Sequence, residues 1–301
     1  MKHFSVHIGL AVFRYVACLI LLFVFASTHA QTKRAFVVGI SEYQQSGENA
    51  WAAIHGANDA ELITPVLKNQ GFKVTKICNK SATANKIRRE MASLIASCKK
   101  GDIVYLHFSC HGQPFEDLNG DEEDGWDESI IPYDALMIYT KGKYEGANHI
   151  TDDELHSFFL QLRKAVGVKG FVSVVIDACH AGNTYMGEEE EDEEPFRGIK
   201  KGFSPNGKVY RPRINARGFF HISQIPGYAN IVVLQACRSY QTNYEIKQDG
   251  NYYGPLSYCV SHVLAKKAIS INLDWVLEVE RMMKSDKRLT RQNMVYETSL
   301  K

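Results

Sequence analysis

A cysteine and a histidine that could act together chemically follow two separate apolar segments of the chain. Residues 171–176 are rich in Val and Ile, and Cys179 lies three positions after them. Residues 102–108 form a second such segment, and His111 lies three positions after it. A thiol is a poor nucleophile at neutral pH unless a neighbouring base or cation promotes its ionisation. The two residues therefore predict a nucleophile and its base, provided that the fold brings them together.

The same two residues also have a purely structural interpretation, as a buried cysteine packed beside a buried histidine. Three features favour chemistry instead. Each residue follows a strand-like segment, a glycine comes shortly after each, and both lie where a parallel sheet would present them at one edge. The backbone N–H groups of Gly112 and Cys179 are then candidate donors for an oxyanion hole, which stabilises negative charge on an attacked carbonyl oxygen.

Strand-like and helix-like segments alternate along the chain. Apolar, β-branched runs predict strands at residues 35–40, 73–78, 102–108, 171–176 and 231–235. Helical patterning predicts helices at residues 55–70, 83–98, 151–163, 255–267 and 273–284. This alternation is typical of an α/β domain with a mainly parallel central sheet and helices on both faces.

The charge balance argues against nucleic acid as a partner. The 35 Lys and Arg residues nearly equal the 34 Asp and Glu residues, and the formal net charge is +1. Basic residues do not gather with aromatic residues on any predicted strand or helix, as a nucleic-acid surface would require. The cysteines show no CxxC pairs, so a zinc site is not expected either.

The N-terminal segment has the pattern of a secretory signal. Basic residues lead into an apolar stretch at residues 15–25, and the small residues Thr28 and Ala30 precede an expected cut at Gln31. The apolar stretch is short for a membrane span. We therefore expect an exported protein, periplasmic or secreted, whose residues 31–301 form one domain without a stable membrane span.

Several segments, in order, resemble those of caspase-like cysteine peptidases, in the metacaspase or bacterial caspase-homologue branch. They are AFVVGISEY from Ala35, HGANDA from His55, GDIVYLHFSCHG from Gly101, GDEEDGWDESIIPYDA from Gly120, TDDEL from Thr151, VVIDACHAG from Val174, QACRSYQTNYE from Gln235 and QNMVYETSL from Gln292. The resemblance covers most of the chain after the signal. It implies a caspase-like three-layer sandwich in which Cys179 attacks a peptide carbonyl and His111 is the base.

The resemblance also implies a substrate preference. Metacaspases cut after Arg or Lys, and the matching positions for the acidic residues of their pocket are Asp59 and Asp177. A buried pair of carboxylates suits a guanidinium group, which can form two parallel hydrogen bonds. Asp59 also has a purely structural interpretation, because aspartate is common as a cap at the start of a helix.

A second cysteine competes for the role of nucleophile. The segment QACR, which contains Cys237, matches the first four residues of an animal caspase signature, and Ser239 breaks the fifth. That signature places the cysteine about 50 residues after the histidine. Cys179 follows His111 by 68 residues and Cys237 by 126. We therefore assign Cys237 to a buried strand end beside the pocket. Cys110 stands where most relatives have glycine, and both a disulfide and simple packing are open for it.

An acidic loop raises the question of calcium. The residues at the first, third, fifth and twelfth positions of an EF-hand-like pattern are Asp117, Asn119, Asp121 and Glu128. Glu122 occupies the sixth position, where the motif needs glycine, so the motif fails. The resemblance instead implies Asp127, Asp152 and Asp153 as ligands of a Ca²⁺ activator, although Asp152 and Asp153 also suit the first turn of a helix. No cofactor is required for the chemistry itself.

An insert at residues 187–217 changes sharply in charge. A glutamate-rich run is followed by a basic stretch, which predicts a flexible linker. Relatives are cut in this interval, often by themselves. The basic candidates for such a cut are Arg197, Lys200, Lys201, Arg211, Arg213 and Arg217. We predict self-cleavage between Arg197 and Arg217.

Together these observations predict an exported cysteine endopeptidase that cuts protein or peptide substrates after Arg or Lys. Two alternatives stay open: a caspase-like scaffold that binds peptides without cutting them, and a peptidase of the same clan that cuts after Asp. The joint presence of His111, Cys179 and Asp177 argues against the scaffold, since a dead homologue has no chemical need for all three. The sequence does not fix the oligomeric state.

Overall fold

The computed structural model describes residues 31–47, 49–179, 195–199, 201–212 and 214–300. The chain divides into two compact units, Met1–Gln31 and Thr32–Lys301, and every described helix and strand belongs to the second. The predicted export signal lies outside the described residues. Within the described part, no helix combines the length and apolar character needed to cross a membrane.

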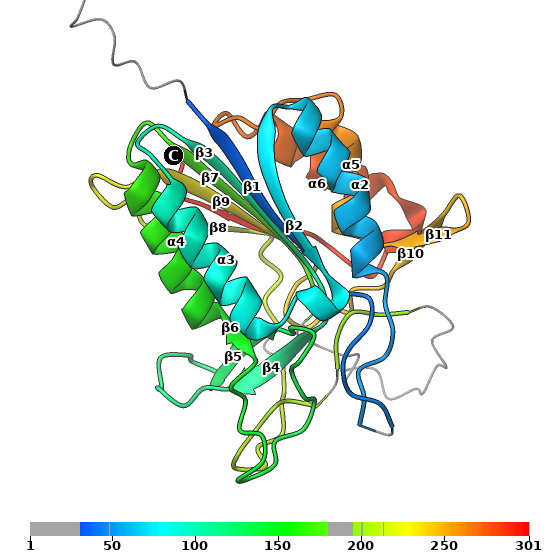
Figure 1. The fold of residues 1–301 in the computed structure, drawn as a ribbon. Helices are drawn as coiled ribbons and strands as arrows, with labels where there is room; N and C mark the ends of the chain where they lie inside the picture. The colour runs from blue at the N-terminus through cyan, green and yellow to red at the C-terminus, as the bar shows by residue number, and fades with distance from the viewer. Residues whose placement is uncertain (1–30, 48, 180–194, 200, 213, 301) are drawn as a thin grey trace, which may run out of the picture. The chain divides into compact units, whose positions relative to one another are not determined.

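A seven-stranded sheet runs through the centre of the domain (Figure 1). Its strands in spatial order are β2 (Phe72–Cys78), β1 (Lys33–Gly39), β3 (Ile103–Ser109), β7 (Phe171–Asp177), β9 (Asn230–Gln235), β12 (Val295–Thr298) and β8 (Phe219–His221). The first five are parallel to one another, whereas β12 pairs antiparallel with β9 and parallel with β8. This arrangement confirms the mainly parallel sheet predicted from the sequence.

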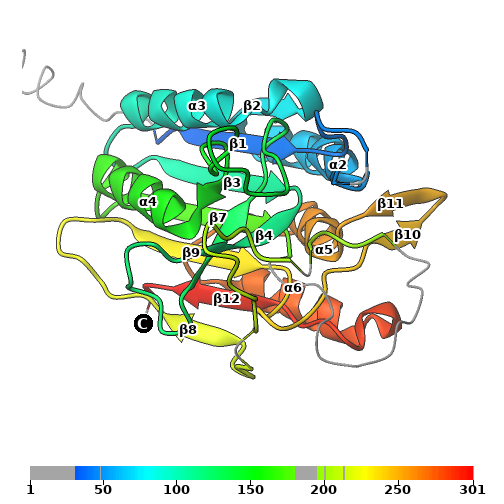
Figure 2. The same cartoon turned by 90° about the horizontal axis from the view of Figure 1, so that it is seen from below.

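Helices cover both faces of the sheet, which gives three layers (Figures 1 and 2). On one face lie α2 (Gly56–Asn69), α5 (Pro255–Leu264) and α6 (Asp274–Ser285), and on the other lie α3 (Ala84–Ser97) and α4 (Asp152–Val166). Successive strand residues point to opposite faces. Val37 accordingly packs with the first group of helices, while Phe36 and Val38 pack with the second.

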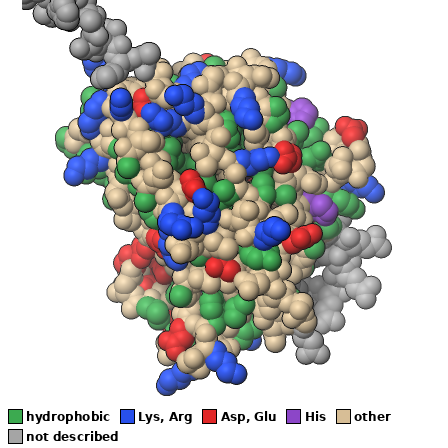
Figure 3. All heavy atoms as spheres, in the orientation of Figure 1, with side chains coloured by type: hydrophobic (Ala, Val, Ile, Leu, Met, Phe, Trp, Pro, Cys, Tyr) green, Lys and Arg blue, Asp and Glu red, His purple; other side chains and the backbone are tan. Residues whose placement is uncertain are grey.

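Smaller elements surround the sheet. A three-stranded antiparallel sheet contains β4 (Gly112–Glu116), β5 (Trp126–Ile130) and β6 (Ile150–Thr151), and β10 (Ile246–Gln248) forms a hairpin with β11 (Asn251–Tyr253). Short 3₁₀ turns occupy Asn79–Ser81 and Lys287–Leu289. The small sheet, the hairpin, β8 and β12 were not predicted from the sequence. On the face shown in Figure 3, Asp and Glu side chains lie among the Lys and Arg side chains.

The register between β3 and β7 sets the relative positions of His111 and Cys179. Ser109, the last residue of β3, is paired with Asp177, the last residue of β7. His111 and Cys179 each follow that pair by two residues. Because the two strands are parallel neighbours, both segments leave the sheet at the same edge.

Two glycines allow α2 to begin directly against this edge. A Cβ atom on Gly56 would lie 2.3 Å from the carbonyl oxygen of Ser109, and one on Gly39 would lie 2.4 Å from the carbonyl oxygen of Gly56. Both obstacles are backbone atoms, which cannot swing aside as a side chain can. The close approach places Asp59, in the first turn of α2, beside the ends of β1 and β3.

We expect the Gly56→Ala substitution to lower the free energy of unfolding by about 1–3 kcal/mol, because the added methyl group overpacks a backbone contact. Urea unfolding of the Cys179→Ala chain, in which the predicted nucleophile is absent, measures this value. Gly218→Ala is the matched control, since the nearest atom to its new Cβ lies 3.8 Å away. Equal stabilities for the two variants would contradict the prediction.

Candidate active site

His111 is buried at the end of β3 in a form suited to accept a proton. Its Nε2 lies 2.9 Å from the carbonyl oxygen of Ala52, and since a carbonyl only accepts, Nε2 carries the hydrogen. Its Nδ1 is buried and has no hydrogen-bond partner among the described residues. Burial lowers the pKa of His111 to about 4, so the ring is neutral near pH 7. The free lone pair of Nδ1 is therefore available as a base.

Two aromatic rings fix the orientation of this imidazole. The ring of Trp51 stacks on His111 with centroids 5.1 Å apart, and the ring of Tyr43 lies 5.2 Å away. The Tyr43 hydroxyl also accepts a hydrogen bond of 2.8 Å from the backbone N–H of His111. These contacts hold the imidazole in place without adding a charge beside it.

Cys179 is fully buried two residues beyond the end of β7. Its thiol lies 3.2 Å from the carbonyl oxygen of Gln241. Its backbone N–H donates a 2.8 Å hydrogen bond to the carbonyl oxygen of Arg197, and the N–H of Gly112 donates to the same oxygen at 3.3 Å. The two amides that the sequence suggested as oxyanion donors thus converge on one carbonyl, that of Arg197.

The side chain of Arg197 fills a fully buried acidic pocket at the same edge. Its Nη2 lies 2.8 Å from a carboxylate oxygen of Asp59 and 2.8 Å from one of Glu245. Its Nη1 lies 3.5 Å from an oxygen of Asp177 and donates to the Ser109 hydroxyl at 2.6 Å. Burial alone would lower the pKa of Arg197, but the three carboxylates raise it above its usual value.

The backbone around Arg197 is bound as a short added strand. Phe196 forms an antiparallel bridge with Tyr244. The N–H of Arg197 donates to the Asn243 carbonyl at 3.0 Å, and the N–H of Glu245 donates to the Pro195 carbonyl at 2.8 Å. Strand addition of this kind is a general way for proteins to bind extended peptides.

The peptide bond after Arg197 lies against the predicted nucleophile. A Cβ atom on Gly198 would be 2.6 Å from the carbonyl oxygen of Cys179 and 3.0 Å from its Cβ. Pocket, hydrogen-bonded carbonyl and adjacent thiol therefore surround the Arg197–Gly198 bond. A substrate cut after arginine would need the same three features.

Buried hydrogen bonds support the acidic residues of the pocket. Asp177 accepts from the side-chain amide of Asn243 and from both the N–H and the hydroxyl of Ser257, each at 2.7 Å. Asp59 accepts from the Ser109 hydroxyl at 2.6 Å and from the N–H of Gly254 at 3.0 Å. Asp59 is thus a pocket residue, and the alternative assignment as a helix cap is wrong because no side chain caps α2.

Glu245 is a third acidic residue of the pocket, and it was not predicted from the sequence. It contacts both Nε and Nη2 of Arg197, at 3.1 and 2.8 Å. His55 contacts both oxygens of the Glu245 carboxylate. The backbone N–H of His55 donates to one oxygen at 2.7 Å, and the ring Nδ1 of His55 lies 2.5 Å from the other. The only sequence signal for this role was its place in the family-like segment that begins at Gln235.

The basic candidates for processing differ sharply in their surroundings. Arg197 is fully buried, whereas Lys201, Arg211 and Arg217 are exposed. Lys200 and Arg213 lie outside the described residues. Within the described part of the predicted flexible insert, Phe203 and Tyr210 are buried as well as Arg197. Cys110 is also buried and free, so of its two open roles packing is the one observed.

A separate acidic cluster lies beside the small sheet. Carboxylate oxygens of Asp117, Asp121 and Asp127 all lie within 4.8 Å of one another. Burial, together with neighbouring carboxylates, raises the pKa of Asp127 and that of Asp152 to about 7 each. Asp153 contributes to both shifts. Asp152 has one buried carboxylate oxygen without a hydrogen-bond partner in the described part of the chain. This donor set fits a hard cation such as Ca²⁺.

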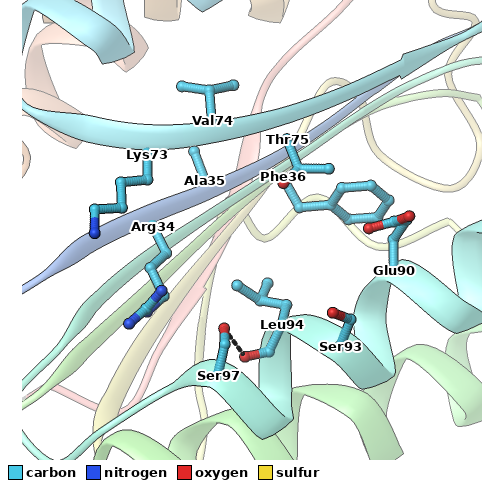
Figure 4. A pocket seen from close by; sticks show the side chains of 10 residues that line it. All are labelled: Arg34, Ala35, Phe36, Lys73, Val74, Thr75, Glu90, Ser93, Leu94 and Ser97. Atoms are coloured by element: carbon cyan, nitrogen blue, oxygen red, sulfur yellow. Dashed lines mark hydrogen bonds between the residues drawn. The ribbon is translucent and has the colours of Figure 1, made fainter.

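Of two cavities in the described structure, one lies at the candidate active site and the other lies away from it. One opens beside the candidate site and is lined in part by Trp51, His111, Met137, Phe196 and Gly198. Another lies between β1, β2 and α3, and Figure 4 shows Arg34, Lys73 and Glu90 among its side chains. Arg34 and Lys73 stand near the starts of their strands, so the second cavity lies away from the edge that carries the thiol and the imidazole.

Comparison with known proteins gives consistent results. The profile of the caspase domain family matches residues 32–301. Metacaspase-2 of Arabidopsis thaliana is 32% identical over 202 residues, which cover 60% of this chain and 44% of that protein. Metacaspase-1 of Mycosarcoma maydis is 26% identical over 269 residues, which cover 77% of this chain and 62% of that protein. The chain thus spans about half the length of the curated relatives it matches.

A solved structure supports the fold independently. The crystal structure of a Geobacter sulfurreducens protein matches with a TM-score of 0.60 and covers 89% of this chain and 93% of its own. At 18% sequence identity, this likeness concerns the fold alone.

Proposed function

The chain belongs to the caspase domain family of cysteine peptidases, and we propose that it is an endopeptidase that cuts after arginine and, less efficiently, after lysine. The observation that carries this proposal is the buried Arg197, whose guanidinium contacts Asp59, Asp177 and Glu245. Lysine offers a single ammonium group and has no counterpart of the arginine Nε, so it cannot make the same set of contacts.

The proposed reaction uses groups already described. His111 Nδ1 takes the proton of the Cys179 thiol, and the sulfur attacks the carbonyl carbon of the residue whose side chain fills the acidic pocket. The N–H groups of Gly112 and Cys179 stabilise the oxyanion that results. The imidazolium then protonates the departing amine, and water hydrolyses the thioester left on Cys179.

We further propose that the chain is its own first substrate and that the bond cut is Arg197–Gly198. The hydrogen bonds from Gly112 and Cys179 to the Arg197 carbonyl support this choice. The closeness of Gly198 to Cys179 supports it as well. The other described basic residues of the insert are exposed, and no comparable set of contacts surrounds them within the described part of the chain.

The wild-type protein should therefore yield a fragment that begins at Gly198, which N-terminal sequencing identifies. Arg197→Ala should slow this cut on the order of 100-fold or more, because hydrogen bonds to a charged group contribute about 1.5–3 kcal/mol each. Cys179→Ala should stay intact, and Arg211→Ala should behave as wild type since its side chain is exposed. Equal fragmentation of the Cys179→Ala chain would refute self-cleavage.

Glu245→Gln should reduce the preference for arginine over lysine. The substitution keeps the shape of the side chain but removes the charge that faces Nε and Nη2. We expect kcat/KM for an arginine peptide to fall about 10- to 100-fold, and that for the matching lysine peptide to fall less. Fluorogenic peptides that differ only in the residue before the reporter measure both values.

Glu61→Gln on the outer side of α2 is the matched control, because the Glu61 side chain is 70% exposed and its ionic partner is Lys76. An unchanged arginine-to-lysine ratio in Glu245→Gln would contradict the assigned role of this residue.

We also propose that the acidic cluster binds Ca²⁺ and thereby supports the active site. Asp127, Asp152 and Asp153 would hold the ion together with Asp117 and Asp121, and the Asp152 oxygen that has no hydrogen-bond partner among the described residues is a ready ligand. Asp127 belongs to β5, and the residue after that strand, Ile131, donates a backbone hydrogen bond to the carbonyl of His111. The bound ion would neutralise repulsion among the carboxylates and stabilise the strand that supports the base.

The raised pKa values give this proposal a pH dependence. Asp127 and Asp152 hold protons up to a pKa of about 7 in the folded protein, whereas an unfolded aspartate loses its proton near pH 4. Without a cation, folding stability should therefore fall as the pH rises from about 4 to about 7. Added Ca²⁺ should raise the Tm of the Cys179→Ala chain more at pH 8 than at pH 5. Asp127→Asn should weaken the Ca²⁺ effect, and the absence of any Ca²⁺-dependent shift at pH 8 would refute the site.

A further inference from the structure

A second thiol lies beside the nucleophile at the edge of the sheet. Cys237 follows β9 as Cys179 follows β7, and these strands are parallel neighbours with Ile176 paired to Gln235. The N–H of Ala236 donates to the carbonyl of Ile176 at 3.1 Å, so the pairing extends almost to both cysteines. The chain thus delivers two sulfur atoms from adjacent strand ends.

The two side chains converge on one acceptor. The Sγ of Cys179 lies 3.2 Å, and that of Cys237 3.5 Å, from the carbonyl oxygen of Gln241. A hydrogen bond between the two cysteine side chains, together with burial, raises the pKa of Cys237 well above its usual value. The two sulfurs therefore lie close together around one carbonyl oxygen, and neither cysteine is in a disulfide.

Cys237 is not merely a small apolar residue in the core. It is buried, yet neither of the two large apolar clusters of the described chain includes it. It lines a polar cavity together with Glu128, Arg217, Arg238 and Glu297. A small polar oxidant therefore has a route to the thiol pair, whereas Cys259 packs within an apolar cluster.

We propose that Cys237 is a resolving cysteine that forms a reversible disulfide with Cys179 and so switches the peptidase off under oxidising conditions. The consequence for activity rests on the proposed role of Cys179 as nucleophile, but the disulfide itself does not. A hydroperoxide oxidises the Cys179 thiol to a sulfenic acid and is itself reduced to an alcohol or water. The Cys237 sulfur then attacks the sulfenic sulfur, the new S–S bond forms, and water leaves.

A dithiol reductant reverses the process by two thiol–disulfide exchanges and is itself oxidised to a disulfide. The same bond protects Cys179 from sulfinic acid, which dithiols do not reduce. Export, which the N-terminal sequence predicts, would expose the chain to an oxidising environment in which such a device has a use.

The test treats the full-length wild-type protein with hydrogen peroxide, blocks the remaining thiols and maps disulfides by mass spectrometry. The expected product is a peptide pair joined through Cys179 and Cys237. Activity on an arginine reporter should fall about tenfold or more and return after dithiothreitol. In Cys237→Ser the same treatment should give sulfinic acid at Cys179 and a loss that dithiothreitol does not reverse. Cys110→Ser, which removes another buried cysteine, should behave as wild type.

Absence of the Cys179–Cys237 pair in the oxidised wild type would overturn the proposal, and so would equal recovery of Cys237→Ser. The disulfide map needs no variant and no activity. If no peptide is cleaved under any condition, the peptidase proposal fails. The disulfide mapping still decides whether Cys179 and Cys237 form a disulfide.

Discussion

A cluster of buried negative charge is the constraint on which the active-site edge depends. Asp59, Asp177 and Glu245 come from α2, β7 and the residue before β10, and all three are fully buried. Bringing such carboxylates together away from water costs several kcal/mol unless a cation compensates them. Arg197 supplies that cation from the chain itself. The pocket that we propose to select a cationic substrate therefore needs a cationic occupant in order to be stable.

In the proposed function, the need for a cation in the pocket links the stability of the fold to control of activity. Arg197 reaches the pocket from the same chain, so in the proposed function it would compete with external peptides at the high effective concentration of an intramolecular group. The backbone N–H groups of Gly112 and Cys179, the proposed oxyanion donors, also both donate to the Arg197 carbonyl. A peptide in trans has to displace side chain and carbonyl together. In the proposed function, the segment that completes the pocket is thus also the first substrate and the first inhibitor.

Local sequence was sufficient to predict five of the seven strands of the central sheet, the five described helices and the placement of His111 and Cys179 after strands, because each depends on a local apolar pattern and the residues just after it. The family resemblance supplied Asp59 and Asp177. Glu245 was missed because a loop residue has no periodicity, and its role arises only when the chain folds back beside β7. The strands β8 and β12 were missed for a similar reason: they are short and pair with partners distant in sequence.

Strand order explains which of the competing cysteines can use the histidine. Neighbouring strands of a sheet lie about 4.8 Å apart. The strand that carries Cys179 is next to the strand that carries His111, whereas β7 separates the strand of Cys237 from it. The first cysteine is thus one strand from the base and the second is two strands away. Spacing along the sequence could only favour Cys179, but the order β3–β7–β9 places its strand between the strand that precedes His111 and the strand that precedes Cys237.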